Sequence, residues 1–143
     1  MGLLEASPPS VPASKEVPIT KDQEEKLSEW YASWYRSLVA RANYLAHDRA
    51  DIQYACKELS SAMATPSKSD LESLKRVERY FKGTPRVVQQ FPWHGRADTL
   101  TVFSDANWAG DKETRKSTLG GAFRLSGHTL KTWSKTQTVV ALS

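Results

Sequence analysis

The chain has one cysteine, few histidines and no long apolar run. The lone Cys56 excludes an internal disulfide framework and a zinc site built from cysteines, and its apolar neighbours predict a buried, reduced thiol. The 3 histidines are far apart in sequence and lack the spacing of metal ligands. No segment approaches the roughly 18 consecutive apolar residues that cross a bilayer as a helix. We therefore expect no membrane partner.

Four of the 7 prolines fall within residues 1–19, with serine and alanine between them. This composition predicts a disordered Pro-rich leader. The leader lacks the basic start and the apolar centre of a secretion signal. We therefore expect an intracellular protein, in the cytoplasm or the nucleus.

A strong excess of one charge is also absent. The net charge is +4 and the isoelectric point is about 9.2, which is compatible with a nucleic-acid partner but not specific for one. The 5 tryptophans and 5 tyrosines are more than a disordered chain carries, so most of the sequence is expected to fold.

Residues 20–85 are expected to form a helical region. Three segments carry apolar side chains every three or four residues, the period of an amphipathic helix. Ser67 is expected to cap the third helix together with Asp70, and Gly83 to end it. Asp48 is expected to cap the second helix. The expected helices span residues 22–46, 51–64 and 67–83.

Residues 86–143 are expected to form a sheet. After Pro85 the apolar period shortens to that of strands, and Ser126–His128 is a tight-turn signal. The fold class is therefore α+β, a helical segment followed by an incomplete, mostly antiparallel sheet. No helix within these residues covers the sheet, so we expect either further chain after Ser143 or cover from the preceding helices. The expected strands span residues 87–91, 100–103, 119–125, 129–133 and 138–142.

Asp105 is the candidate for metal chemistry. It follows the apolar run Val102–Phe103 and precedes small and turn-forming residues, so its carboxylate is expected at the end of a strand. Carboxylate oxygens suit Mg²⁺, although an aspartate here can equally cap a turn. Asp111 and Glu113 lie nearby, in what is expected to be a charged surface loop.

Basic side chains form three candidate nucleic-acid contacts. For the helical group, a solvated face with ion pairs from Glu72 and Glu78 is the alternative. For the strand group, Trp133 offers a stacking surface, although both Trp133 and Trp108 fit a core role as well. The three groups are Lys75, Arg79 and Lys82 on the third helix, Arg115 and Lys116 in a loop, and Lys131 and Lys135 beside Trp133.

Several short motifs together resemble the C-terminal part of Ty1/copia-type retrotransposon Pol polyproteins. The resemblance covers about residues 27–143 and keeps the same order throughout. The motifs are Tyr35–Val39, Tyr44–Ala46, Arg49–Ile52, Leu74–Val77, Arg79–Thr84, Ser104–Asp111, Arg115–Thr118, Trp133–Lys135 and Val140–Ser143.

The resemblance implies that residues 20–85 are a connection or thumb-like region and that residues 86–143 are the N-terminal part of an RNase H domain. RNase H cleaves the RNA of RNA–DNA hybrids with two Mg²⁺ ions held by four acidic residues, and the first of these matches Asp105. The second is a glutamate after a Val-Ala-Leu-Ser-Ser run, of which this sequence reaches Ser143. The family usually has aspartate where this chain has Asn107, and often proline at Ala50. No Tyr-x-Asp-Asp polymerase signature is present.

Two functions are therefore expected. The first is a fragment of a reverse transcriptase/RNase H polyprotein, inactive alone because one carboxylate cannot organise two metal ions. Its partners are the rest of Pol and an RNA–DNA hybrid. The second is a noncatalytic module, a degenerate or domesticated relic that binds nucleic acid or protein. A helical scaffold without a ligand is the third and plainest alternative.

Overall fold

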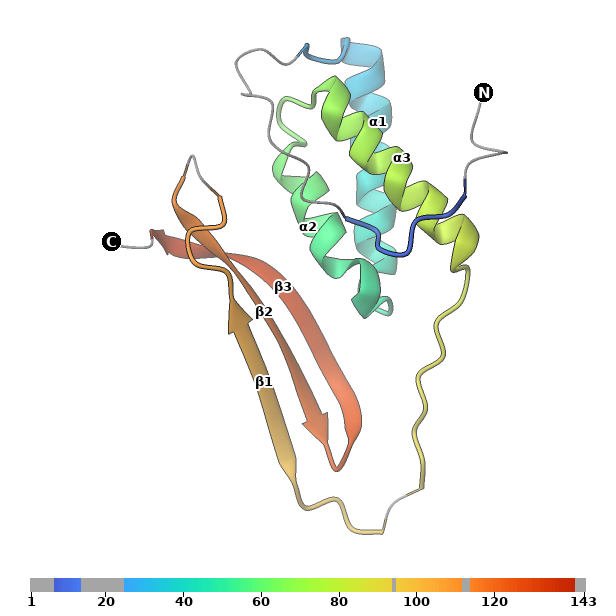
Figure 1. Ribbon diagram of the computed structural model, residues 1–143, viewed down its shortest axis with the longest axis vertical. Coiled ribbons are helices and arrows are strands. Elements are labelled where there is room, and N and C mark those ends of the chain that lie inside the picture. The colour runs from blue at the N-terminus through green and yellow to red at the C-terminus, as the bar shows by residue number, and fades with distance from the viewer. Residues whose placement is uncertain (1–6, 14–24, 94, 112–113, 141–143) are drawn as a thin grey trace. The chain divides into compact units, whose positions relative to one another are not determined.

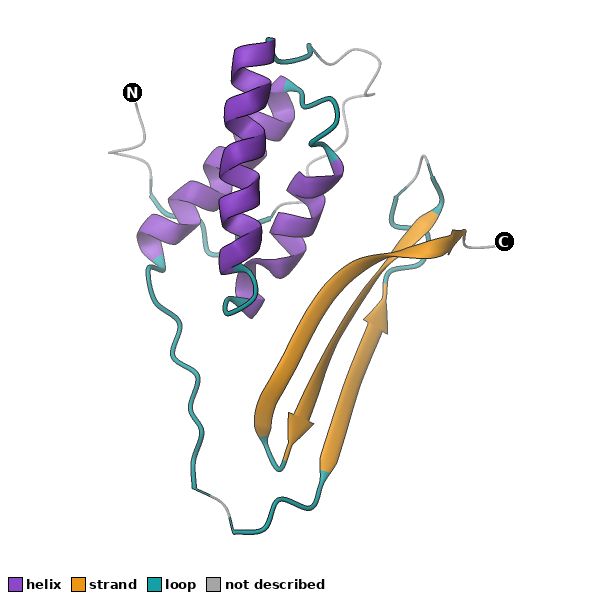
Figure 2. Cartoon of the chain, turned by 180° about the vertical axis from the view of Figure 1, so that it is seen from behind, coloured by secondary structure: helices purple, strands orange, loops and turns teal. Residues whose placement is uncertain are grey.

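The computed structural model describes residues 7–13, 25–93, 95–111 and 114–140. The chain divides into two compact units, Met1–Val87 and Val88–Ser143, one helical and one built on a sheet (Figures 1 and 2). This confirms the α+β prediction. No helix within the described part of the chain is long and apolar enough to cross a membrane. The elements are α1 (Glu29–Leu45), a 3₁₀ turn η2 (Ala50–Ile52), α2 (Gln53–Ser61), α3 (Lys68–Gly83), β1 (Leu100–Ala106), β2 (Lys116–Leu125) and β3 (His128–Val140).

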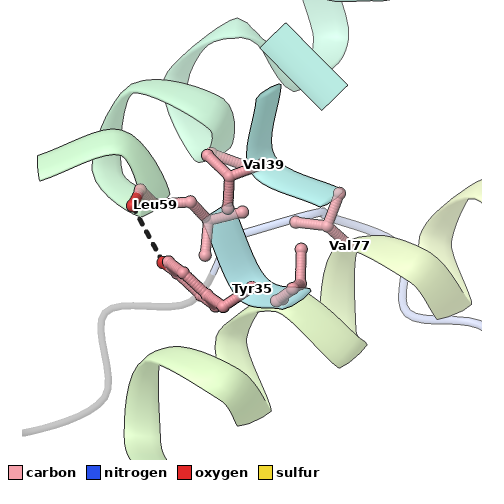
Figure 3. Close-up of a cluster of buried hydrophobic side chains, with 6 residues drawn as sticks. Tyr35, Val39, Leu59 and Val77 are labelled. Atoms are coloured by element: carbon pink, nitrogen blue, oxygen red, sulfur yellow. Dashed lines mark hydrogen bonds between the residues drawn. The ribbon is translucent and has the colours of Figure 1, made fainter. Parts of the chain in front are cut away.

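The helical unit has a well-buried core between its three helices (Figure 3). Tyr35 and Val39 from α1 meet Leu59 from α2 and Val77 from α3. The Tyr35 hydroxyl donates a hydrogen bond of 2.8 Å to the backbone oxygen of Leu59, so its polar atom is satisfied inside the core. Burial raises the pKa of Tyr35, and the charge of Asp70 adds to this effect. A second cluster contains Ile52, Cys56 and Tyr80.

The helix ends agree with the sequence at α3 and differ at α2. Ser67 and Asp70 form the predicted capping box, with each side chain bonding the other residue's backbone N–H. Gly83 is the last helical residue rather than the one after it. The prediction that Asp48 caps the second helix is wrong, because the chain enters through the 3₁₀ turn η2, which follows Arg49 and has no side-chain cap.

The first helix is shorter at its start than predicted. Residues 25–27 run alongside residues 66–68, where Leu27 N–H donates to Pro66 O at 3.0 Å and Lys68 N–H donates to Glu25 O at 3.1 Å. This pairing occupies backbone groups that a helix would use, so α1 begins at Glu29. Residues 22–24 of the predicted helix lie outside the described residues.

Residues 7–13 differ from the predicted disordered leader, because they lie against α3 (Figure 1). The Arg76 side chain donates a hydrogen bond of 3.3 Å to the backbone oxygen of Val11. Pro8 contacts Gly83, and Ala13 packs on the helical core. Proline limits the backbone conformations of the unfolded chain, so this proline-rich segment loses less conformational entropy when it becomes ordered.

The three strands form one antiparallel sheet in the order β1-β2-β3. The predicted turn joins β2 to β3, with positive φ at Ser126 and Gly127. The predicted strands at 129–133 and 138–142 are one strand, β3, up to Val140, and residues 141–142 lie outside the described residues. The strand predicted at 87–91 is wrong, because those residues are exposed and extended without a partner strand.

Candidate metal and nucleic-acid site

Asp105 lies near the end of β1 with an exposed side chain. Its register partner on β2 is Gly120, where an added Cβ would meet no atom within 4 Å. The neighbouring position therefore leaves the carboxylate open to solvent. One carboxylate oxygen accepts a 2.9 Å hydrogen bond from the Ala106 N–H, which restricts the side chain. Asp105 thus presents a positioned, solvent-accessible carboxylate.

The loop after Asp105 is organised by Asn107 and Ser117. The Asn107 side-chain oxygen accepts a hydrogen bond from the Thr118 N–H, and the Asn107 N–H donates to Thr118 O at 3.1 Å. Ser117 is buried, and its hydroxyl accepts from the Ala109 N–H at 3.0 Å. Sequence reasoning missed both roles, although asparagine directly after a strand is a recognised turn signal.

Arg115 and Lys116 lie at the other end of this loop. Arg115 is exposed and has a left-handed backbone, with φ of 55°, and Lys116 is the first residue of β2. Asp111 accepts a 2.6 Å hydrogen bond from the Thr114 hydroxyl, and residues 112–113, including Glu113, lie outside the described residues. Arg115 therefore presents an exposed cation just before β2.

The third candidate group lies on the opposite face of the sheet from Asp105. Side chains alternate between faces along a strand, and residues opposite each other in register share a face. Asp105 shares its face with Gly120 and Ser134, whereas Gly121 and Trp133 share the other. Lys131 and Lys135 are two residues from Trp133 on either side, so they lie on that other face too. The sheet does not bring these residues to Asp105.

Trp133 is half-buried and packs within its own face. Its indole lies over Gly121, where a Cβ would overlap the ring, and its ring centroid is 4.9 Å from that of Phe123. This agrees with the core alternative for Trp133. The same alternative is wrong for Trp108, which is 71% exposed in the loop after β1.

The basic residues of α3 are partly engaged. Lys75 forms an ion pair with Glu72 at 2.6 Å, whereas the i, i+4 spacing in the sequence predicts that Glu72 pairs with Arg76. Arg79 is half-buried, and its Nε has no hydrogen-bond partner. Lys82 is exposed in the last turn of the helix. Lys75, Arg79 and Lys82 belong to the helical unit, separate from the Asp105 unit.

The residues that the structure describes do not form a complete metal site. Over residues 7–13, 25–93, 95–111 and 114–140, no three side chains of His, Cys, Asp or Glu come together to hold an ion. Asp105 supplies a single carboxylate. A two-metal site needs several carboxylates around ions about 3.5–4 Å apart. The described residues alone therefore do not fit a two-Mg²⁺ centre.

Comparison with curated proteins identifies the family. The chain is 41% identical over 109 residues to the retrovirus-related Pol polyprotein from transposon RE1 of Arabidopsis thaliana, covering 76% of this chain. It is 36% identical over 141 residues to the corresponding polyprotein from transposon RE2 of the same plant, covering 99% of this chain. The chain is homologous to a segment of copia-type retrotransposon Pol polyproteins.

This Pol segment spans a small part of those relatives, 7% of the RE1 polyprotein and 10% of the RE2 polyprotein. It is also 40% identical over 110 residues to secreted RxLR effector protein 161 of Plasmopara viticola, where the match covers 77% of that protein. No family model and no solved structure matches the chain.

One further cluster in the Pol segment escaped sequence reasoning. Arg49 pairs with Asp51 at 2.7 Å, and the Tyr80 hydroxyl donates to Asp51 at 2.9 Å. The hydrogen bonds from Arg49 lower the pKa of Asp51, more than burial raises it. Arg49 also donates to Thr84 O at 3.0 Å. These bonds join the entry of α2 to the end of α3, and all their groups are satisfied within the cluster.

Proposed function

We propose that this chain is part of the RNase H region of a retrotransposon polyprotein whose parent activity is Mg²⁺-dependent hydrolysis of RNA in RNA–DNA hybrids. The observation that supports it is Asp105, an exposed carboxylate aimed from a strand end and left open by Gly120. Homology to Pol polyproteins supplies the second support. In this proposal Asp105 is one ligand of the metal pair.

The same proposal holds that the chain alone does not cleave hybrids. A single carboxylate on an exposed strand leaves most of the charge on two divalent ions unbalanced. When bound in the complete domain, Mg²⁺ would stabilise charge on the attacked phosphate. Asp105 would provide one oxygen for it, and the loop held by Asn107 and Ser117 would keep the strand end in place.

Nucleic acid would be held by the basic groups in this proposal. Arg115 and Lys116 follow the loop that starts beside Asp105, so they are the candidates for phosphates near the metal. Lys131, Trp133 and Lys135 lie on the other face, where they would meet a different stretch of backbone. Phosphate contacts of this kind are independent of sequence and weaken with salt.

The test is a gain of activity in a longer protein. The segment of the RE1 polyprotein that matches this chain is replaced by the chain itself, and cleavage of a labelled RNA–DNA hybrid is measured with and without Mg²⁺. We expect Mg²⁺-dependent cleavage that Asp105→Asn removes. Asp98→Asn is the matched control, because Asp98 is an exposed aspartate of the same unit whose carboxylate contacts the adjacent Thr99 hydroxyl.

Cleavage that survives Asp105→Asn in this chimera would refute the metal role of Asp105. The 143-residue chain alone is expected to give no cleavage in the same assay. Mg²⁺-dependent cleavage by that chain, abolished by Asp105→Asn, would refute the proposed inactivity.

A second candidate is a noncatalytic binding module. It is favoured by the match to the Plasmopara viticola protein, because the matched region makes up 77% of that relative and so forms most of a short protein. Hybrid, duplex DNA and single strands are titrated at 50 and 200 mM salt (about a tenfold loss in affinity or more is expected if several phosphates are contacted). The double variant Lys131→Gln/Lys135→Gln should reduce the salt slope. Salt-independent or absent binding would dismiss this candidate.

A further inference from the structure

Residues 7–13, here called the strap, lie along one line of side chains on the surface of α3. Pro8 contacts Gly83 at the end of the helix, and Val11 O accepts the 3.3 Å hydrogen bond from Arg76, two turns earlier. Ala13 then reaches the core cluster that contains Leu74 and Val77. The strap therefore runs antiparallel to α3 over about two helical turns.

Arg79 lies on the same line of the helix. Residues three and four apart share a helix face, so Arg79 falls between Arg76 and Gly83. Its Nε is buried and has no hydrogen-bond partner. A buried guanidinium N–H without an acceptor costs free energy, so this group would be better satisfied by an anion than by the strap. Arg76 has a neutral carbonyl from the strap, which is a weaker acceptor than a phosphate oxygen.

The strap carries no charge that could balance the two arginines. Residues 7–13 are serines, prolines, valine and alanine. The strap contacts this face of α3 through the Val11 carbonyl at Arg76 and through Pro8 at Gly83. A nucleic-acid phosphate offers charged oxygens in the geometry that the planar guanidinium group of arginine binds best.

We propose that the strap covers the line of α3 that carries Arg76, Arg79 and Gly83, and that it competes with nucleic-acid phosphates for binding to this line. The inference rests on the nucleic-acid binding proposed above and extends it, because it adds Arg76 and Arg79 of α3 to the contact residues and makes their contact conditional on the strap. Removal of the strap exposes two arginines to the backbone of a nucleic acid.

Gly83→Ala tests this proposal without deleting any of the chain. The added Cβ would lie 2.7 Å from Cγ of Pro8 and closer still to its Cβ, so it would overlap the Pro8 ring, and Gly83 is helical, so alanine is compatible with the backbone. The strap should leave, which is measured as faster subtilisin cleavage within residues 7–13. Pro8→Gly removes the overlapping ring atoms, so the double variant Pro8→Gly/Gly83→Ala should return the cleavage rate toward that of the original chain.

Binding of a 20-base-pair RNA–DNA hybrid is then compared across the same variants. We expect Gly83→Ala to raise the affinity several-fold at 50 mM salt and to steepen the salt slope by about 1 to 2, since each added phosphate contact contributes close to one. Gly95→Ala is the control, because a Cβ at Gly95 meets no atom within 4 Å.

Two results would overturn the competition. In the first, Gly83→Ala speeds strap cleavage but leaves affinity and salt slope unchanged. In the second, Gly83→Ala leaves strap cleavage unchanged, so the strap does not occupy this line. Absence of hybrid binding in every variant would also overturn it. The hybrid-cleavage assay of the chimera reports on Asp105 separately, so failure of one proposal is distinguishable from failure of the other.

Discussion

The helical unit and the sheet unit bury their apolar residues very differently. In the helical unit Tyr35, Val39 and Ile52 are fully buried between helices. Among the described residues of the sheet unit, Ser117 is the one buried residue, and Val102, Phe103 and Leu130 are all more than half exposed. The helices thus carry their own core, whereas the three strands are held chiefly by their ladders and one aromatic pair.

Because of this difference, the unit with the larger buried core is not the unit that carries the candidate metal ligand. Burial of apolar side chains stabilises a unit by about 1.5–3 kcal/mol per large side chain, so the helical unit is the stronger candidate to fold alone. The candidate metal ligand and its loop belong to the sheet unit, which buries little. The proposed chemistry therefore depends on the unit with less stability of its own.

The largest expected effect is in the helical core. Ile52→Ala leaves a cavity at a residue with 0% exposure, so we expect a loss of about 2–5 kcal/mol in the free energy of unfolding. Val102→Ala in β1, 53% exposed, should cost under about 1 kcal/mol. Urea unfolding followed by circular dichroism measures both. Equal losses in the two variants would erase the contrast between the units.

The next effect probes the aromatic pair of the sheet. Gly121→Ala places a Cβ into the Trp133 ring, and we expect a loss of about 1–3 kcal/mol together with a shift in tryptophan emission. Gly120→Ala is the control, since its Cβ meets no atom within 4 Å and points to the opposite face. If both variants behave alike, Trp133 does not organise that face.

A smaller effect concerns the charged cluster of the helical unit. The pKa of Asp51 is lowered by hydrogen bonds from Arg49, so its contribution to stability is present above the ordinary aspartate pKa of about 3.9 and is lost as pH falls below it. We expect Asp51→Asn to cost about 1–2 kcal/mol at pH 7 and progressively less as pH falls through the lowered pKa of Asp51.

The measurement is thermal unfolding from pH 2 to pH 7. Asp48→Asn is the control, because Asp48 is an exposed aspartate of the preceding turn. A difference between Asp51→Asn and the original chain that stays constant down to pH 2 would contradict the assigned role of the Asp51 carboxylate.

The smallest effect concerns the loop after Asp105. Asn107→Ala removes the acceptor for the Thr118 N–H and should cost about 1 kcal/mol, whereas Asn107→Asp keeps an acceptor oxygen and should cost less. Amide hydrogen exchange at Thr118 checks this directly. Equal protection of Thr118 in Asn107→Ala and in the original chain would remove Asn107 from its organising role.

Local signals predicted the elements best where one short-range interaction decides the outcome. The Ser67–Asp70 capping box and the turn at Ser126–Gly127 depend on adjacent residues alone, and both predictions are confirmed. The start of α1 depends on pairing with residues 66–68, forty residues away, so periodicity could not place it. The strap escaped prediction for the same reason, because its partner is the surface of α3.

For the candidate site, the sequence located the strand end at Asp105 but not the faces of the sheet. The separation of Asp105 from Lys131, Trp133 and Lys135 follows from the register between β2 and β3, and a shift of one residue would reverse it. The roles proposed for these residues in binding, and for Asp105 with Mg²⁺, stay predictions.

The lone cysteine of the helical core provides a chemical reporter. Cys56 is buried, and burial raises the pKa of its thiol to about 11, so at neutral pH it reacts slowly with alkylating reagents. Its modification rate therefore reports opening of the helical unit. A cysteine introduced by Ser104→Cys on exposed β1 would instead be labelled first, so this variant can carry a single dye on the sheet without removal of Cys56.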